Sequence, residues 1–275
     1  MVAIYSVYEG LFGRAEVVEY NHDLVAHAHS QTHLGYWMGG GGAHAQVMGQ
    51  SIAYGRDMVL VLDGLKSHDL RLNHAHSPAI FLMLYINDDW IDKLFSHLGR
   101  PVDLPQVQFS IDASVQAASW QLMRVLVESH KHLETRFDCE VTWLVQHTVE
   151  QALKASPDYV LPSRRKMVDY RLRVAMAHMR ENIANPTVAE EVAEVVGLSR
   201  SRFFELFHDQ LGTTPNVYWN AVRVEEAEKK LREDSDNMTT VAMDLGFSTP
   251  GNFSRFFREH VGLTPTAYRK LNHAI

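Results

Sequence analysis

The sequence is short of cysteine, of long apolar runs and of positive charge. Cys139 is the single cysteine in 275 residues, which excludes an internal disulfide framework and a cysteine-rich zinc module and fits a reducing, cytoplasmic compartment. We expect Cys139 to be packed on a helix rather than to act as a nucleophile. No run of about 18 uncharged apolar residues occurs, so no membrane-spanning helix is expected. The first residues lack the pattern of a signal peptide, so export is not expected either.

The distribution of charge along the chain limits how it can bind nucleic acid. The net charge is −7, the hydrophobic fraction 46% and the charged fraction 21%, which is typical of a globular protein, and the length predicts two domains. From Arg164 onward 16 Lys and Arg residues accompany 15 Asp and Glu residues, whereas residues 1–163 carry 10 and 18. Nucleic-acid binding by the C-terminal part must therefore depend on where a few arginines lie.

Short runs rich in β-branched and aromatic residues dominate the N-terminal part. They are separated by Gly, Asp and Asn, which predicts a small antiparallel sandwich or barrel. The runs are residues 15–20, 33–38, 43–48, 57–62, 68–72 and 79–86. Four consecutive glycines, Gly39 to Gly42, lie between two runs and predict a hairpin turn. A phosphate-binding loop is not favoured, because neither a Lys-Ser/Thr pair nor a helical pattern follows these glycines.

The apolar spacing becomes helical from Asp88 onward. It predicts a first helix from there to Leu98 and two longer amphipathic helices over residues 112–133 and 136–155. Their apolar stripes are Trp120, Met123, Leu126 and Val127 on the first long helix, and Val141, Leu144, Val145, Thr148 and Val149 on the second. The stripes could pack inside the domain or form a dimer interface. Two prolines and a basic end then predict a linker over residues 156–166, between domains at 1–155 and 167–275.

An internal repeat fills most of the C-terminal part. The positions that recur 49 or 50 residues later are Val192, Ala193, Gly197, Ser199, Phe203, Phe207, Gly212, Pro215 and Tyr218. In each copy a short helix, a turn glycine and a capping residue before a second helix indicate a helix-turn-helix unit, at residues 187–212 and 238–262. We expect the caps and helix starts at Thr187 and Ser199 in the first unit, and at Thr239 or Thr240 and Ser248 in the second.

The second helix of each unit has an inner and an outer face. Phe203 and Phe207 are spaced four residues apart, as are Phe253 and Phe257, so each pair should point inward. The outer faces can bind DNA, because Arg and Asn read base edges while neighbouring polar groups hold phosphates. The residues assigned to DNA are Ser199, Arg200, Ser201, Arg202, Phe204, Glu205 and His208 in the first unit, and Thr249, Gly251, Asn252, Ser254, Arg255 and Arg258 in the second. A purely structural role for both units would leave these outer faces unexplained.

The second copy resembles the signature of a known family. Gly246-Phe247-Ser248, residues 253–258, Gly262-Leu263-Thr264-Pro265 and Tyr268-Arg269 match the DNA-binding domain of the AraC/XylS transcription regulators. The resemblance covers about residues 168–270. It implies seven helices, with two helix-turn-helix subdomains joined by a long helix, after a cupin-like barrel. It also implies double-stranded promoter DNA, a small-molecule effector and RNA polymerase as partners, and a homodimer. Glu205 departs from the family, which often has a basic residue there. Two consequences stay open: the first unit binds phosphates more weakly, or Glu205 accepts a hydrogen bond from a cytosine amino group.

Histidines are concentrated in the N-terminal part, where eight of the 16 lie between His22 and His76. The spacing of His27, His29, His33 and His68 resembles the ligand pattern of metal cupins, and imidazole suits zinc, nickel, copper or iron. The cupin glycine before the first pair is absent, and His33 stands where a glutamate is usual. Three roles stay open: lining an effector pocket together with Trp37, binding a divalent transition metal, and ordinary packing. No cofactor is required by the sequence.

These features together predict an α+β protein. An N-terminal antiparallel, cupin-like β-barrel with following helices precedes an all-α domain with two helix-turn-helix units. The predicted function is a sequence-specific transcription regulator controlled by an effector in the barrel. Two alternatives remain: a metal-dependent cupin enzyme or metal sensor with an attached DNA-binding domain, and a DNA binder whose N-terminal domain only dimerises. No catalytic residue can be assigned, and we do not expect an enzyme.

Overall fold

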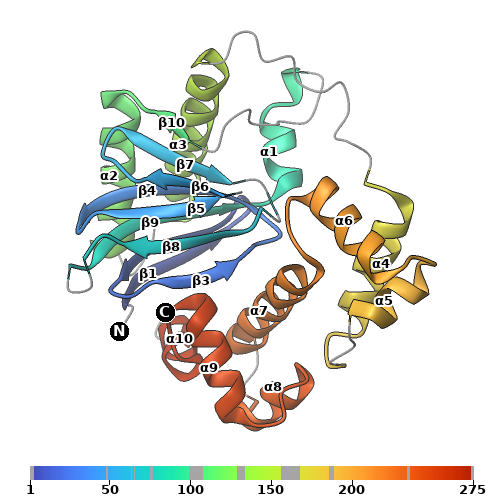
Figure 1. Cartoon of the computed structure of the whole chain (residues 1–275). Helices are drawn as coiled ribbons and strands as arrows, with labels where there is room; N and C mark the ends of the chain where they lie inside the picture. The colour runs from blue at the N-terminus through green and yellow to red at the C-terminus, as the bar shows by residue number, and fades with distance from the viewer. Residues whose placement is uncertain are drawn as a thin grey trace.

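The computed structural model describes residues 3–47, 49–62, 64, 66–74, 77–98, 108–128, 134–155, 168–185, 189–233 and 236–273. A sheet-rich N-terminal part is followed by helices that make up the described C-terminal part (Figure 1). This confirms the predicted α+β class. Among the helices of the described ranges, none is long and apolar enough to cross a membrane.

The strands pair into two antiparallel sheets. One sheet has six strands in the order β1-β2-β9-β4-β7-β10, and the other has four in the order β3-β8-β5-β6. The strands are β1 (Ala3–Gly10), β2 (Gly13–Tyr20), β3 (Leu24–His27), β4 (Thr32–Gly40), β5 (Ala43–Val47), β6 (Gln50–Ala53), β7 (Met58–Leu62), β8 (His68–Leu72), β9 (Ala79–Ile86) and β10 (Gln108–Ser110). The described strands form two facing sheets, and no pairing among them closes the sheets into one barrel. The predicted antiparallel, sheet-rich N-terminal domain is thus confirmed, as the sandwich rather than the closed form.

The sequence predicts the inner strands of both sheets and misses β1, β3, β6 and β10. These are the four edge strands. An edge strand pairs on one side only and is less enclosed, so its sequence need not be a continuous apolar run. In β6, for example, only Ile52 is buried.

Strand β9 shows why the central run of the six-stranded sheet is apolar without interruption. Leu82, Leu84 and Ile86 point to the face covered by the helices that follow the sheet domain, whereas Phe81 and Tyr85 point to the opposite face, toward the second sheet. A strand that is enclosed on both faces needs apolar residues at every position. The odd-numbered positions of β9 thereby contribute to the space between the two sheets.

The four glycines do not form the hairpin turn that the sequence predicts. Strands β4 and β5 belong to different sheets, so Gly39 to Gly42 carry the chain from one sheet to the other. Gly40 has a φ of 82°, and a Cβ there would lie 2.2 Å from the carbonyl oxygen of Pro78. Gly41 donates its N–H to that same oxygen at 2.7 Å. The close approach of two backbones at this corner accounts for the glycines.

Helices α1 (Asp88–Leu94), η1 (Ser96–Leu98), α2 (Ala113–Glu128) and α3 (Glu134–Ala155) follow the sheets, close to the predicted ranges. The stripe predicted on α3 is confirmed as internal packing, because its five residues are fully buried and the Thr148 hydroxyl bonds Tyr36 at 2.8 Å. Cys139, on the same helix, is exposed, so its predicted packing is wrong.

The stripe predicted on α2 is only partly internal. Leu126 is buried, but Trp120 and Val127 are 38% and 40% exposed. The buried face instead carries Ser119 with Leu122, and the Ser119 hydroxyl donates to the Gln116 carbonyl at 2.8 Å. A serine that bonds its own helix can be buried, and this hides the true register from an apolar pattern.

The described C-terminal part has the seven helices that the family resemblance implies. They are α4 (Tyr170–Glu181), α5 (Ala189–Val195), α6 (Arg200–Leu211), α7 (Pro215–Glu233), α8 (Met238–Asp244), α9 (Pro250–Val261) and α10 (Pro265–His273). The predicted linker, residues 156–166, lies outside the described residues. Helix α7 is the long connection between the two units.

The two helix-turn-helix units have different surroundings. The first unit has its own core with α4 and the start of α7. The second unit shares one continuous apolar core with the sheets, in which Phe253 and Phe257 belong to the same cluster as Val18, Leu24 and Phe81. Strand β3 contacts α7 and α9, and β1 contacts α10 (Figure 1). The second unit is therefore docked on the sheet domain.

Candidate functional site

The turn glycines of both helix-turn-helix units have the predicted left-handed backbone. Gly197 has a φ of 67° and Gly246 a φ of 76°. A Cβ at Gly246 would also lie 2.2 Å from the Ala184 carbonyl oxygen. Glycine adopts this conformation without steric cost, so the second helix of each unit can leave the turn at a fixed angle.

The cap of α6 lies where the sequence predicts, but the caps of the second unit do not. Ser199 accepts from the Arg202 N–H at 3.3 Å. In the second unit α8 begins at Met238 with Asn237 as its cap, one residue or two before the predicted start at Thr239 or Thr240. Helix α9 has Thr249 as its cap in place of the predicted Ser248. The additional residue of the second copy moves the helix start, and the Ser248 hydroxyl instead accepts from the Asn252 side chain at 3.0 Å. Thr187, predicted as the first cap, lies outside the described residues.

The faces of α6 and α9 divide as predicted. Phe203, Phe207, Phe253 and Phe257 are fully buried. Of the residues assigned to DNA, all are exposed except Phe204 and Ser254, which are half-buried. Each unit thus offers a polar, accessible face on its second helix, opposite its aromatic core.

The basic residues of the two faces differ in their partners. In the first unit Arg200 forms an ion pair with Glu190, and Arg202 pairs with Glu205 at 3.1 Å. In the second unit Arg255 and Arg258 make no hydrogen bond or ion pair with any part of the chain that the structure describes. Glu205 therefore forms an ion pair with Arg202 of its own helix. In the second unit, Arg255 and Arg258 have no such partner among the described residues and are available to bind an anion.

Arg258 lies beside the sheet domain. It lines a groove together with His22 and Asp23, which precede β3, and Val25 of β3. Burial is the main cause that lowers the pKa of His22, and the nearby Arg258 charge lowers it further. Arg258 is thus an exposed residue of α9 at the edge of the sheet domain.

Four of the predicted histidines meet between the two sheets. His27 at the end of β3 and His68 at the start of β8 have ring centroids 4.3 Å apart, and the ring of His33 on β4 lies 4.7 Å from that of His68. His29, in the loop after β3, lies 5.0 Å from both His27 and His33. We call these four residues the histidine cluster. Together with Tyr20, Tyr54, Tyr85, Asp69 and apolar residues, they line a cavity of about 30 Å³.

Trp37 is not among the residues that line this cavity. It lies on the same strand as His33 but four residues further on, or about 13 Å along a strand. Its indole N–H donates to the Gly41 carbonyl at 3.0 Å. The structure therefore brings together the four histidines of the predicted effector site and leaves Trp37 apart.

Burial keeps the histidine cluster uncharged. Desolvation lowers the pKa of His27, His33 and His68 to about 3 and that of His29 well below its usual value, and the neighbouring imidazoles lower each of them further. A neutral imidazole has a free nitrogen lone pair, which is the form that binds a metal ion.

The histidine cluster predicts acid sensitivity of the metal-free protein. Each of these histidines has a pKa of about 6.5 when unfolded, so below that pH the unfolded chain binds protons that the folded chain does not. The free energy of unfolding should fall between pH 7 and pH 5, by up to about 1.4 kcal/mol per pH unit for each buried histidine. Urea unfolding with a chelator present measures it. His33→Gln should reduce the slope and the exposed His74→Gln should not; equal slopes in both variants would contradict the assignment.

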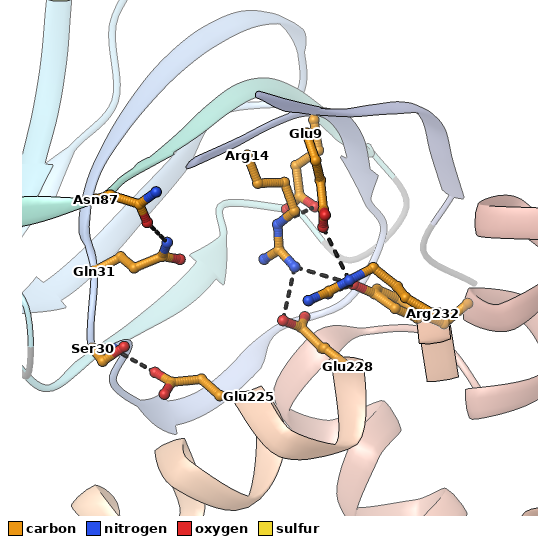
Figure 2. A network of polar contacts seen from close by, with 10 residues as sticks. Glu9, Arg14, Ser30, Gln31, Asn87, Glu225, Glu228 and Arg232 are labelled. Atoms are coloured by element: carbon orange, nitrogen blue, oxygen red, sulfur yellow. Dashed lines mark hydrogen bonds and ion pairs between the residues drawn. The ribbon is translucent and has the colours of Figure 1, made fainter. Parts of the chain in front are cut away.

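An ionic network, buried at Arg14 and Glu228, joins the sheet domain to α7 and α10, and no sequence motif predicts it. Figure 2 shows Arg14 of β2 reaching Glu228 of α7, with a nitrogen to oxygen distance of 2.7 Å, and Arg232 reaching Glu9 at 3.0 Å. Arg14 also donates to the Tyr268 hydroxyl at 3.1 Å. The available signal was a pair of charged residues, Arg14 and Glu16, at alternate positions of a strand that is rich in apolar residues.

The loop that carries His29 has its own contact with α7. The backbone N–H of Ser30 donates to the Glu225 carboxylate at 2.6 Å, as Figure 2 shows. Burial raises the pKa of Glu225, and the hydrogen bonds from Ser30 lower it. The helix that spaces the two helix-turn-helix units is therefore held at Glu225 and Glu228 by the sheet domain.

Comparisons with known proteins agree with this arrangement. Residues 192–271 match a family model described as a helix-turn-helix domain. The probable transcriptional regulator LumQ of Photobacterium leiognathi is 26% identical over 156 residues, which cover 57% of this chain and 61% of LumQ. An uncharacterized HTH-type transcriptional regulator of Haemophilus influenzae is 26% identical over 102 residues, 37% of this chain and 34% of that protein. The chain thus spans about a third to three-fifths of the length of these two relatives.

Two longer matches extend over the sheet domain. Unsaturated fatty acid bound wild-type ToxT from Vibrio cholerae superposes with a TM-score of 0.61 at 11% identity, over 100% of this chain and 96% of that chain, which shows a common fold. The HTH-type transcriptional activator RhaS of Klebsiella pneumoniae is 32% identical over 219 residues, which cover 77% of this chain and 76% of RhaS. With that identity over that share of both proteins, and with two helix-turn-helix units joined by α7, this chain belongs to the AraC/XylS family of transcription regulators.

Proposed function

We propose that this chain is a sequence-specific DNA-binding transcription regulator, controlled by a ligand in the sheet domain. The observation that carries the proposal is the pair of exposed polar faces on α6 and α9, held on either side of the single helix α7. If the two faces lie about one turn of DNA apart, roughly 34 Å, one chain can enter two successive major grooves. Within this proposal, the outer residues of α6 and α9 contact promoter DNA, and the second unit supplies the free arginines.

Within this proposal, the sheet domain binds the ligand that controls DNA binding. It contacts α7, α9 and α10, so a change in its structure can reach the DNA-binding unit. ToxT, which shares the fold, has been solved with an unsaturated fatty acid bound. Trp120, Val127 and Trp143 leave exposed apolar surface on α2 and α3, which we propose as the homodimer contact. RNA polymerase is the further partner of a regulator of this kind.

An enzymatic role for the histidine cluster is less well supported. The cavity of about 30 Å³ has room for about two water molecules. Sites for organic ligands usually measure about 300–1,000 Å³. An organic substrate would therefore have no room beside the imidazoles in this conformation. A regulatory role of the cluster does not require such a substrate.

Genome-wide mapping of binding sites tests the proposed function. We expect a small set of sites that share one sequence motif with two half-sites about one helical turn apart. Gel shifts with the purified chain should then show salt-dependent binding, preferring that motif over scrambled DNA. Equal affinity for motif and scrambled DNA would overturn sequence-specific regulation.

Arg255→Ala tests the assignment of α9 as a base-reading helix. Its guanidinium is exposed and unpaired within the described residues, so we expect the substitution to weaken binding to the motif by about 1–3 kcal/mol and to relax specificity. Arg258→Ala should instead weaken binding to all sequences similarly and reduce its salt dependence, as loss of a phosphate contact does. Gel shifts over a salt series measure both. Unchanged affinity of the Arg255 variant for its motif would remove Arg255 from the interface.

A further inference from the structure

The histidine cluster has the geometry of a metal site. One ligand nitrogen from each of His27, His29 and His68 can be chosen so that all three lie within 4.8 Å of one another. His33 is not in this group, but its ring is adjacent, with its centroid 5.0 Å from that of His29 and 4.7 Å from that of His68, so a shift of the ring would bring in a fourth nitrogen. Imidazoles that converge in this way suit zinc, nickel, copper or iron and are poor ligands for magnesium or calcium.

The hydrogen bonds around the cluster orient two of its rings. Nδ1 of His27 lies 2.8 Å from the Val25 carbonyl oxygen, and Nδ1 of His68 lies 2.9 Å from the Lys66 carbonyl oxygen. A ring whose Nδ1–H donates to a backbone carbonyl keeps its Nε2 lone pair free, and this is the usual outer contact of a metal-bound histidine. The cavity of about 30 Å³ has room for an ion and not for an organic molecule.

We propose that His27, His29 and His68, with His33 as the fourth ligand, bind a divalent transition-metal ion, and that this ion controls how the sheet domain holds α7. The control of DNA binding by the ion rests on the proposed function, because it names the ligand that regulates a DNA-binding protein. Metal binding itself can be measured without DNA.

Binding the ion must move the cluster. Zinc takes imidazole nitrogens at about 2.0–2.1 Å, which places tetrahedral ligands about 3.4 Å from one another. The nitrogens of His27, His29 and His68 lie within 4.8 Å of one another, and His33 is not part of that group, so binding all four draws the cluster together. His27 and His68 lie on paired strands, whereas His29 lies in the loop between β3 and β4 and is the ligand that can shift.

Two sets of contacts connect this loop to α7. Ser30, next to His29, donates its N–H to Glu225. The Tyr85 ring also packs against His29, with centroids 5.0 Å apart, and the Arg14 guanidinium lies 4.3 Å from the centre of the same ring. Arg14 in turn pairs with Glu228. A movement of His29 is thus transmitted to Glu225 and Glu228, one helical turn apart on the helix that spaces the two DNA-binding units.

Titration of the full-length, chelator-treated protein with zinc chloride in a calorimeter tests the site. We expect one zinc ion per chain and no heat with magnesium chloride. His29→Gln should weaken zinc binding by more than about 100-fold, because even the loss of an outer contact costs about 10–100-fold. His74→Gln, a change of an exposed histidine outside the cluster, should bind zinc normally. Circular dichroism checks that the His29 variant is folded. No zinc binding by the folded wild-type chain, or equal binding by both variants, would overturn the proposal.

The effect on DNA is tested separately, by gel shift with and without zinc. We expect zinc to change the affinity of the wild-type chain for its motif by about 5–150-fold, the usual range of allosteric coupling. Glu225→Ala should keep the zinc affinity but reduce this change, whereas Glu226→Ala, a neighbour on α7, should retain it. An unchanged DNA affinity on zinc binding would overturn control by the metal. If the chelator-treated protein does not bind the DNA motif, either before or after zinc is added, the proposed function fails. The calorimetric titration still decides whether the metal site exists.

Discussion

An Arg14→Met variant should lose about 3–5 kcal/mol of its free energy of unfolding. Arg14 is 8% exposed, and its guanidinium is the cation nearest to two buried carboxylates, Glu228 at 2.7 Å and Glu16 at 3.7 Å. Burial raises the pKa of Glu16, and the Arg14 charge opposes that rise. Methionine fills part of the volume and leaves both carboxylates without this partner. Removing one member of a buried ion pair is costly because the other charge stays desolvated.

Urea unfolding of the wild-type and variant proteins measures this loss. Arg124→Met is the matched control, because Arg124 pairs with Glu128 on the surface of α2, where both side chains are more than half exposed. That pair should contribute no more than about 0.5 kcal/mol. A second substitution, Glu228→Gln, should recover part of the stability that Arg14→Met loses. Equal losses in the Arg14 and Arg124 variants would show that the network does not hold the domains together.

Phe257→Ala should destabilise the protein by about 3–5 kcal/mol and loosen the sheet domain together with the second helix-turn-helix unit. Phe257 is fully buried, in the cluster that also holds Leu24 and Val18 of the sheets. Truncation of a buried phenylalanine removes its apolar contacts and leaves a cavity. Because the cluster is continuous across the two parts, the cavity affects both of them.

Hydrogen exchange measured peptide by peptide shows where the loss falls. In Phe257→Ala, faster exchange is expected in α8 to α10 and also in β1 and β3. Phe207→Ala makes the equivalent change in the first unit, whose core excludes the sheets, so faster exchange should stay within α4 to α7. The same exchange pattern in both variants would contradict the separate packing of the two units.

The DNA-binding faces could be predicted from the sequence in more detail than the histidine cluster. The DNA-binding faces follow from local rules: Phe203 and Phe207 recur at helical spacing, and Ser199 precedes a helix as a cap. The errors in the second unit are small shifts of helix starts: α8 begins at Met238, and one added residue moved the cap of α9 from Ser248 to Thr249. The histidines were identified as candidates, but Trp37 was grouped with them wrongly, since sequence proximity to His33 does not measure distance along an extended strand.

The sequence by itself determined the two helix-turn-helix units, the helical spacer and the apolar inner strands. Each of these depends on residues within a few turns or one strand of each other, where periodicity and capping act. The tertiary structure decided what those elements meet. It arranged the strands as two facing sheets, gathered His27, His29, His33 and His68 around one small cavity, and paired Arg14 with Glu228, 214 residues away. Such contacts depend on how faces pack over long separations in the chain, and no local pattern records which buried charge or imidazole will find which partner.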